Sequence, residues 1–222
     1  MKLFENKELK IERFISGSLS NNSYLIVSKA TDDCLIIDVP DNPRELINKI
    51  PRNRINKSEN LKKIKILITH GHYDHIEGLE LITERLGLLD VHIGFVDANY
   101  LNYQGNVIRL RNQKEIDISD EKINLIYTPG HTEGSICYYA DFNEKRFLFS
   151  GDTLFPGGPG KTTDSNNFKK IYASIKNKIY SLPKDTIISP GHGESITLED
   201  SMNEFNNFQY KNYIFGDISW QS

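Results

Sequence analysis

The stretch Thr69-His70-Gly71-His72-Tyr73-Asp74-His75 decides the fold of this chain. It completes Ile64–Thr69, an apolar run typical of a buried strand that delivers His70 at its end. Alternation beyond the strand aims His70 and His72 at one metal ion, while Asp74 and His75, one step further along a tight loop, reach a second. Imidazole and carboxylate groups suit zinc or iron at about 2.0–2.2 Å. A packed core histidine would explain one of these residues, not the whole cluster.

Three more ligand-type residues follow strand-like runs and stand beside glycine. They are His131 in Pro129-Gly130-His131, Asp152 in Ser150-Gly151-Asp152 and His192 in Pro190-Gly191-His192-Gly193. The remaining histidine, His92 in Val91-His92-Ile93, is interpreted as an ordinary strand residue. The sequence therefore predicts seven metal ligands: His70, His72, Asp74, His75, His131, Asp152 and His192.

Composition limits the class of protein. The chain has 222 residues, of which 38% are hydrophobic, enough for one domain with a sizeable core. A net charge of −3, with both signs interspersed, argues against a nucleic-acid-coating surface. The sequence shows neither a membrane span nor a signal peptide. Cys34 and Cys137 lie in apolar runs outside any Cys-x-x-Cys pair, so we expect buried thiols in a cytoplasmic protein.

Strands and helices alternate along the whole chain. Short β-rich runs predict strands at Ile11–Ile15, Tyr24–Val27, Cys34–Asp38, Ile64–Thr69, Val91–Gly94, Ile123–Tyr127, Ser135–Ala140, Arg146–Phe149 and Thr186–Ser189. Helices are expected after Asn42 as N-cap, over Leu79–Leu88, around Asp97–Tyr103, over Phe168–Tyr180 and over Leu198–Phe208. The charged segment 52–63 is expected to be a solvated loop. Each predicted ligand lies just past a strand, so we expect one α/β domain over residues 1–222, with helices outside two packed sheets and ligands along one rim.

The ordered motifs His-x-His-x-Asp-His, Pro-Gly-His, Gly-Asp-Thr-Leu-Phe and Pro-Gly-His-Gly resemble the metallo-β-lactamase superfamily, and most closely its glyoxalase II-like branch. The resemblance spans roughly residues 20–195. It implies the αββα four-layer sandwich of that fold, with the metals at one edge. It also implies one metal position of His70, His72 and His131, a second of Asp74, His75 and His192, and a bridging Asp152.

Two departures from the family pattern affect what the resemblance implies. Family members often carry Asp-x-Gly after the early strand, whereas this chain has Asp38-Val39-Pro40, which leaves the role of Asp38 open. Full-length glyoxalase II enzymes add a helical C-terminal domain that helps to bind glutathione. Only a short segment follows His192 here, which leaves glutathione thioester specificity open.

The loop Phe155–Thr162 follows Asp152 closely, and we expect it to border the metal site. Its one cation, Lys161, is predicted to meet an anionic part of the substrate, with a solvated surface lysine as the alternative. Gly160-Lys161-Thr162 is not a phosphate-binding P-loop, because that motif needs glycine where Phe155 stands. The aromatic side chains of Phe208, Tyr210, Tyr213, Phe215 and Trp220 are expected to close the core or a subunit contact.

The expected function is that of a metal-dependent hydrolase. Two divalent ions, zinc or alternatively iron, would supply a bridging hydroxide that attacks a small-molecule thioester, ester or lactone. Asp74 would act in catalysis by orienting that hydroxide as well as ligating an ion. The alternatives are a mononuclear iron persulfide dioxygenase that uses His70, His131 and Asp152, and a phosphodiesterase or nuclease of the same fold. A homo-oligomer is allowed by the sequence, and neither nucleic acid nor a membrane is an expected partner.

Overall fold

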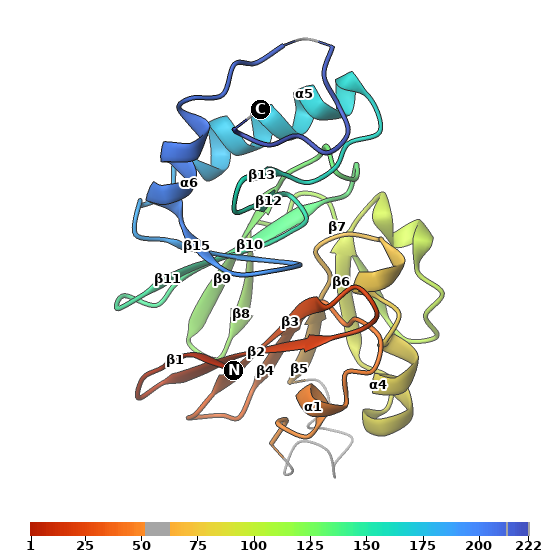
Figure 1. The fold of residues 1–222 in the computed structure, drawn as a ribbon. Coiled ribbons are helices and arrows are strands. Elements are labelled where there is room, and N and C mark those ends of the chain that lie inside the picture. The colour runs from red at the N-terminus through yellow and green to blue at the C-terminus, as the bar shows by residue number, and fades with distance from the viewer. Residues whose placement is uncertain (52–62, 212, 222) are drawn as a thin grey trace. The chain divides into compact units, whose positions relative to one another are not determined.

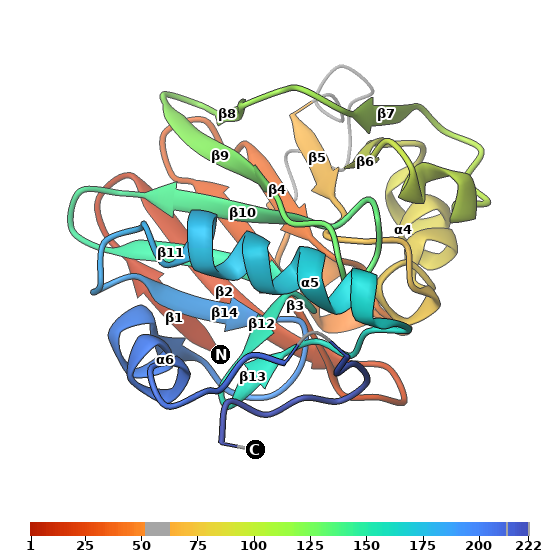
Figure 2. The ribbon, with the colours of Figure 1, turned by 90° about the horizontal axis from the view of Figure 1, so that it is seen from above.

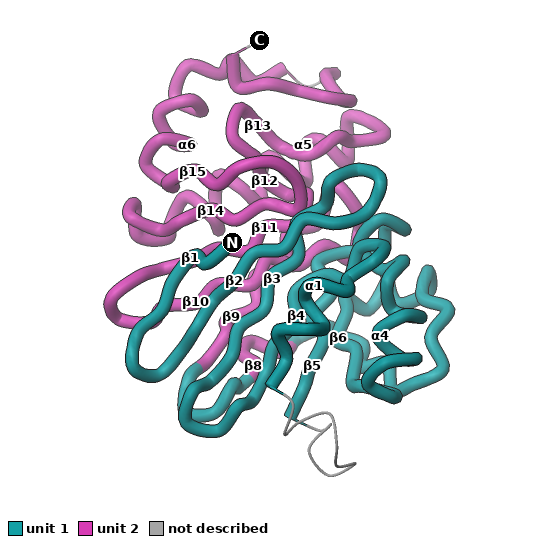
Figure 3. The backbone as a smooth tube through the Cα atoms, turned by 60° about the horizontal axis from the view of Figure 1, so that its bottom comes forward, with its two compact units in different colours: residues 1–112, 117–121 teal, residues 113–116, 122–222 magenta. Residues whose placement is uncertain are grey.

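The computed structural model describes residues 1–51, 63–211 and 213–221. The chain divides into two compact units (Figure 3): unit 1 comprises Met1–Asn112 and Asp117–Glu121, and unit 2 comprises Gln113–Ile116 and Lys122–Ser222. Each unit contains a mixed sheet and its own helices. The expectation that they form one domain stays a prediction, and the expected solvated loop at 52–63 lies outside the described residues except for Lys63.

Unit 1 is built on a seven-stranded sheet in the order β1-β2-β3-β4-β5-β6-β7. Strands β1 to β4 are antiparallel neighbours, whereas β4, β5, β6 and β7 run parallel. The strands are β1 (Lys2–Glu5), β2 (Leu9–Ser16), β3 (Asn21–Ser28), β4 (Cys34–Ile37), β5 (Ile64–Leu67), β6 (Asp90–Gly94) and β7 (Val107–Leu110). Because parallel strands end at the same edge of a sheet, the loops that follow β4, β5 and β6 lie next to one another.

Helices cover one face of this sheet (Figure 1). The helices α1 (Arg44–Ile47) and α4 (Leu79–Leu86) bury Leu46, Leu79 and Ile82 against the sheet residues Ile36, Ile66 and Val91. Every residue of β4 is buried, so both faces of the sheet are covered at its centre. Two short 3-10 turns, η1 (Tyr73–His75) and η2 (Asp97–Tyr100), complete the unit.

The six-stranded sheet has the order β15-β14-β11-β10-β9-β8. Its strands are β8 (Glu115–Ile118), β9 (Glu121–Tyr127), β10 (Ile136–Asp141), β11 (Arg146–Gly151), β14 (Ile187–Pro190) and β15 (Ile196–Thr197). A separate hairpin joins β12 (Leu154–Phe155) to β13 (Gly158–Pro159). Strands β11 and β14 are parallel, and β9 runs in the same direction because both it and β11 are antiparallel to β10. The loops after β9, β11 and β14 therefore leave the same edge of the sheet.

Helices α5 (Ser165–Ser174) and α6 (Leu198–Phe205) pack on this second sheet, and Figure 2 shows α5 crossing β10 and β11. The helix α5 continues into a π-helical turn, η3 (Ile175–Ile179). The apolar side chains of Phe168, Ile171 and Leu198 meet those of Cys137, Leu148 and Ile188 in one core. Cys34 and Cys137 are both buried thiols that form no disulfide, as expected.

Several sequence-based boundaries differ from the structure, and three of the differences have a clear physical reason or change the type of element. The first helix begins at Arg44 without a side-chain cap, because Asn42 has a left-handed backbone (φ 54°) and its side chain instead accepts a hydrogen bond from Arg44. The helix expected from Phe168 begins at Ser165, because the Asp164 carboxylate caps it. The expected helix at Asp97 is a single 3-10 turn.

Within the described residues, no helix has the length and apolar character of a membrane span.

Candidate metal centre

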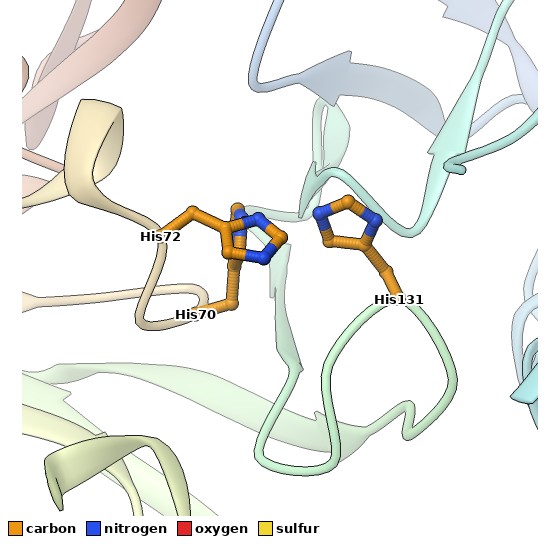
Figure 4. A group of neighbouring side chains, drawn as sticks. All are labelled: His70, His72 and His131. Carbon is orange, nitrogen blue, oxygen red and sulfur yellow. The ribbon is translucent and has the colours of Figure 1, made fainter. Parts of the chain in front are cut away.

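Two of the predicted ligands, His70 and His72, lie in the loop that follows β5. The strand β5 is buried between β4 and β6, so its end fixes the start of this loop. The imidazole Nε2 of His70 and Nδ1 of His72 lie 3.0 Å apart, and the two rings meet edge to face with centroids 4.6 Å apart (Figure 4). Such a separation suits two nitrogens that ligate the same ion at about 2.0–2.1 Å each.

A hydrogen-bond chain sets the tautomer of His70. The Thr69 hydroxyl donates to Asp38 Oδ2 at 2.7 Å. Since that proton is committed, Thr69 Oγ1 accepts from Nδ1–H of His70 at 3.1 Å. The proton of neutral His70 therefore sits on Nδ1, and Nε2 keeps the lone pair that a metal requires.

Asp38, whose role was left open by the sequence, supports the whole ligand loop. It follows β4 with a left-handed backbone (φ 56°) and is buried. Its Oδ1 accepts the backbone N–H of Thr69 at 2.7 Å, and its Oδ2 accepts Nδ1–H of His75 at 2.8 Å. Nε2 of the fully buried His75 is thereby left as the metal-binding nitrogen, 3.7 Å from Asp74 Oδ2.

Two further side chains hold the loop from other directions. Asn21, at the start of β3, donates from Nδ2 to Asp74 Oδ2 at 2.8 Å in a buried contact. Asp97, at the start of η2, accepts the backbone N–H of Gly71 at 2.9 Å. Sequence reasoning did not find Asn21 or Asp97. The sequence signal that could have indicated them is their position: Asn21 follows a turn and Asp97 follows a strand.

The other three predicted ligands leave one edge of the unit 2 sheet, since His131, Asp152 and His192 follow β9, β11 and β14. Asp152 Oδ2 lies 3.6 Å from His131 Nε2 and 3.6 Å from His192 Nε2. These distances exceed a normal hydrogen bond but suit ligands that share an ion, which lie roughly 3–4 Å apart when each is about 2.0–2.2 Å from the metal. Asp152 thus stands between two imidazoles.

The tautomer of His131 is also fixed, because its Nδ1 lies 2.8 Å from the carbonyl oxygen of Lys161. A carbonyl only accepts, so Nδ1–H donates and Nε2 is left for a metal. Gly160 makes this approach feasible: a Cβ there would overlap the Asp152 carbonyl oxygen and come within 3.1 Å of His131 Nδ1. The Lys161 side chain itself is 69% exposed and lies 4.0 Å from the Asp217 carboxylate.

The candidate ligand atoms are of the kinds that bind a divalent transition metal. Nitrogen and carboxylate ligands are what zinc and iron prefer, and three imidazoles have the non-ligating nitrogen hydrogen-bonded to oxygen. Among the described residues, all seven predicted ligands belong to groups of side chains that could hold an ion.

His92 lies outside these groups, on β6. Burial, reinforced by the Lys65 ammonium, lowers the pKa of His92 to about 4, so this imidazole is neutral at pH 7. Burial also raises the pKa of the Cys137 thiol to about 11. Neither group offers a charged partner or a thiolate nucleophile at neutral pH.

The sequence profile of the metallo-beta-lactamase superfamily matches residues 17–192. A protein of Bacillus subtilis (strain 168) named probable metallo-hydrolase YqgX is 30% identical, over 90% of this chain and 98% of its own length. Hydroxyacylglutathione hydrolases of Schizosaccharomyces pombe (named as probable) and of Buchnera aphidicola are 32% and 36% identical, over 79% and 78% of this chain. The chain spans 65% and 63% of the length of these two relatives.

Solved structures agree with this fold. The BLEG-1 B3 metallo-beta-lactamase matches with a TM-score of 0.73 and 26% identity, over 87% of this chain and 96% of that one. A structure titled TTHA1623 in a di-iron-bound form matches with a TM-score of 0.63 and 25% identity, over 86% and 96%. The expected α/β fold class is confirmed.

Proposed function

The chain belongs to the metallo-beta-lactamase superfamily, and from that premise we propose that it is a metal-dependent hydrolase of small-molecule thioesters, esters or lactones. The observation that carries the proposal is the tautomer of three of the candidate ligand histidines. His70, His75 and His131 each bind oxygen through Nδ1 and so keep Nε2 for a metal. Three histidines with a purely structural role would not be expected to share this pattern, in which Nδ1 binds oxygen and Nε2 is left for a metal.

We assign the seven candidate ligands to two ions, as the resemblance of the motifs to the family pattern implies. His70, His72 and His131 would hold one ion, Asp74, His75 and His192 the other, and Asp152 both. The short distances inside each unit support the assignment, as does the order of the motifs along the chain.

Metal ions held by these residues would supply a water activated at neutral pH and would polarise the substrate carbonyl. The protein's own residues orient the reaction. Asp74 is held by a hydrogen bond from Asn21. In that position it would accept a hydrogen bond from the attacking water and direct the lone pair of that water at the carbonyl carbon. The chain needs no protein nucleophile: it has no Gly-x-Ser-x-Gly motif, and Cys137 is a buried, protonated thiol.

The relatives favour a thioester among the three substrate types, since two are named hydroxyacylglutathione hydrolases. Because this chain covers only 65% and 63% of their length, glutathione recognition is not part of the proposal. Zinc is the proposed ion, and the di-iron structure keeps iron as the alternative. Two buried thiols that form no disulfide suit the reducing cytoplasm, where we place the enzyme.

Elemental analysis of protein from metal-replete medium tests the proposal, paired with a panel of thioesters, lactones, phosphodiesters and β-lactams. We expect close to two ions per chain and hydrolysis of an acyl substrate. Asp74→Ala and Asp152→Ala should each lower that activity by several orders of magnitude while the fold persists, because both residues act on the ions rather than in an apolar core.

One tightly bound iron with sulfur-dependent oxygen uptake would replace the proposal with a persulfide dioxygenase. Cleavage of phosphodiesters alone would replace it with a nuclease.

Lys161 is proposed as a contact for an anionic part of the substrate. Its ammonium is exposed and lies 4.0 Å from the Asp217 carboxylate, so it is open to a carboxylate ligand. Lys161→Ala should then raise KM for a carboxylate-bearing substrate and leave metal content unchanged, since the backbone carbonyl that binds His131 remains. Equal kinetics on anionic and neutral substrates would reduce Lys161 to a solvated surface residue.

A further inference from the structure

Residues 213–221, which we call the C-terminal strap, bind along the loop that follows Asp152. Thr162 and Gly216 exchange two backbone hydrogen bonds, at 3.1 Å and 2.9 Å. Further along the strap, the backbone N–H of Trp220 and the hydroxyl of Ser219 both donate to the carbonyl of Gly157, at 2.8 Å and 3.2 Å. The strap is therefore hydrogen-bonded to this loop at two positions, Thr162 and Gly157.

Trp220 anchors the strap in the core of unit 2. Its side chain is 1% exposed, and its indole meets the rings of Phe205 and Phe208 edge to face, with centroids 5.0 Å and 4.9 Å away. Phe205 belongs to α6, so the strap is fixed to that helix. Aromatic side chains bury large apolar areas, so this ring cluster stabilises the position of the strap.

The hairpin of β12 and β13 is held from both sides. The backbone N–H of Gly157 donates to Glu204 Oε2 on α6 at 2.8 Å. On the strap side, a Cβ at Gly158 would come within 2.5 Å of the carbonyl oxygen of Ile218, so strap and hairpin are in direct backbone contact. Loss of the strap would remove the contacts on one side of this hairpin.

The same loop delivers the carbonyl that orients His131. Lys161 lies directly before Thr162, whose backbone the strap binds, and directly after Gly160, which packs against Asp152. The position of the Lys161 carbonyl is thus determined from two sides: by the metal-ligand loop through Gly160 and by the strap through Thr162.

We propose that the C-terminal strap is a positioning element for the metal ligand His131, acting through the carbonyl of Lys161. The inference rests on the proposed metal site. It goes beyond the family match, which ends at residue 192, and so makes the affinity of one metal position depend on a segment outside the matched residues.

The test compares three substitutions in the full chain. Trp220→Ala loosens the anchor, Trp220→Phe restores most of the ring, and Gly216→Ala strains the bridge to Thr162, since Gly216 has a φ of 93° that alanine adopts poorly. Phe142→Ala is the control, because it removes a buried ring from the turn between β10 and β11. Each variant is measured for zinc affinity by competition with a chelator, for the visible spectrum of its Co²⁺ form and for thermal stability.

We expect Trp220→Ala and Gly216→Ala to weaken one zinc position by about 10-fold to 100-fold, the usual effect of losing a partner of a metal-bound histidine. The Co²⁺ bands of both should shift, Trp220→Phe should stay near wild type, and Phe142→Ala should lose stability with unchanged affinity. Wild-type affinity and spectra in Trp220→Ala and Gly216→Ala overturn the proposal, and Gly216→Ala decides it if Trp220→Ala does not fold. A wild-type chain that binds neither Zn²⁺ nor Co²⁺ would instead defeat the proposed function.

Discussion

Single residues around Asp38 show how one carboxylate organises a site. Its two oxygens accept three hydrogen bonds, from the Thr69 backbone, the Thr69 hydroxyl and the His75 imidazole. The left-handed backbone of Asp38 costs free energy, of order 1 kcal/mol for a residue other than glycine, and these contacts hold it in place. The sequence proposed the ligands but did not reveal this support, because hydrogen-bond partners more than thirty positions apart leave no local pattern.

Asp38→Asn should weaken metal binding without removing a ligand. The amide cannot accept three hydrogen bonds as the carboxylate does, so His75 loses its fixed tautomer. We expect affinity for one ion to fall about 10-fold to 100-fold, measured by chelator competition. Asp90→Asn, which changes a carboxylate on β6 that accepts from Asn106, is the matched control. Unchanged affinity in Asp38→Asn would mean that its contacts serve only the fold.

His92 allows a prediction about pH. Its pKa is about 4 in the folded protein and 6.5 in the unfolded chain, so the unfolded state binds more protons between these values. Stability from this residue is therefore complete above pH 6.5 and is lost as pH falls towards 4. His92→Gln should keep most activity, and its free energy of unfolding should fall less than that of wild type between pH 7 and pH 5, by on the order of 1 kcal/mol. Equal losses, or an inactive variant with full metal content, would show that His92 has been misassigned.

Among the elements, those with strong periodicity were predicted well and those fixed by distant partners were not. The buried runs at β4 and β5 were found because continuous apolar residues predict strands covered on both faces. The short strands β12, β13 and β15 have two residues each, too few for any alternation. The predicted start of helix α5 was three residues too late, because Asp164 and the three polar residues after it are typical of a loop.

Asp164 makes a measurable contribution to α5. Its Oδ1 accepts the backbone N–H groups of Asn166 and Asn167, at 2.8 Å and 2.9 Å, which would otherwise lack an intrahelical partner. Asp164→Ala should lower the free energy of unfolding by about 1 kcal/mol, while Asp164→Ser should recover most of it. Urea denaturation of both variants checks this, and equal midpoints for Asp164→Ala and wild type would contradict it.

For the whole molecule, the sequence offered candidate ligands but not the framework that presents them. Seven candidates could be proposed because each comes after a strand-like run, a pattern visible along the chain. The two sheets explain the pattern: β4, β5 and β6 end at one edge of the first, and β9, β11 and β14 at one edge of the second. Sheet order and strand direction come from long-range pairing, which local periodicity does not encode.

Bound metal should stabilise the folded chain, because the proposed ligands are held in place only in the native state. A ligand that binds only the native state adds RT ln(1 + [L]/Kd), which is about 2.7 kcal/mol at a hundredfold excess over Kd. Treatment with a chelator should therefore lower the Tm of the wild-type chain, and added Zn²⁺ should restore it. Asp152→Ala, which loses the residue assigned to both ions, should show a much smaller shift. His92→Gln should show the full shift, because His92 lies outside every group of candidate ligands. A wild-type Tm that does not respond to chelator or Zn²⁺ would mean that the seven residues do not bind metal in the folded protein.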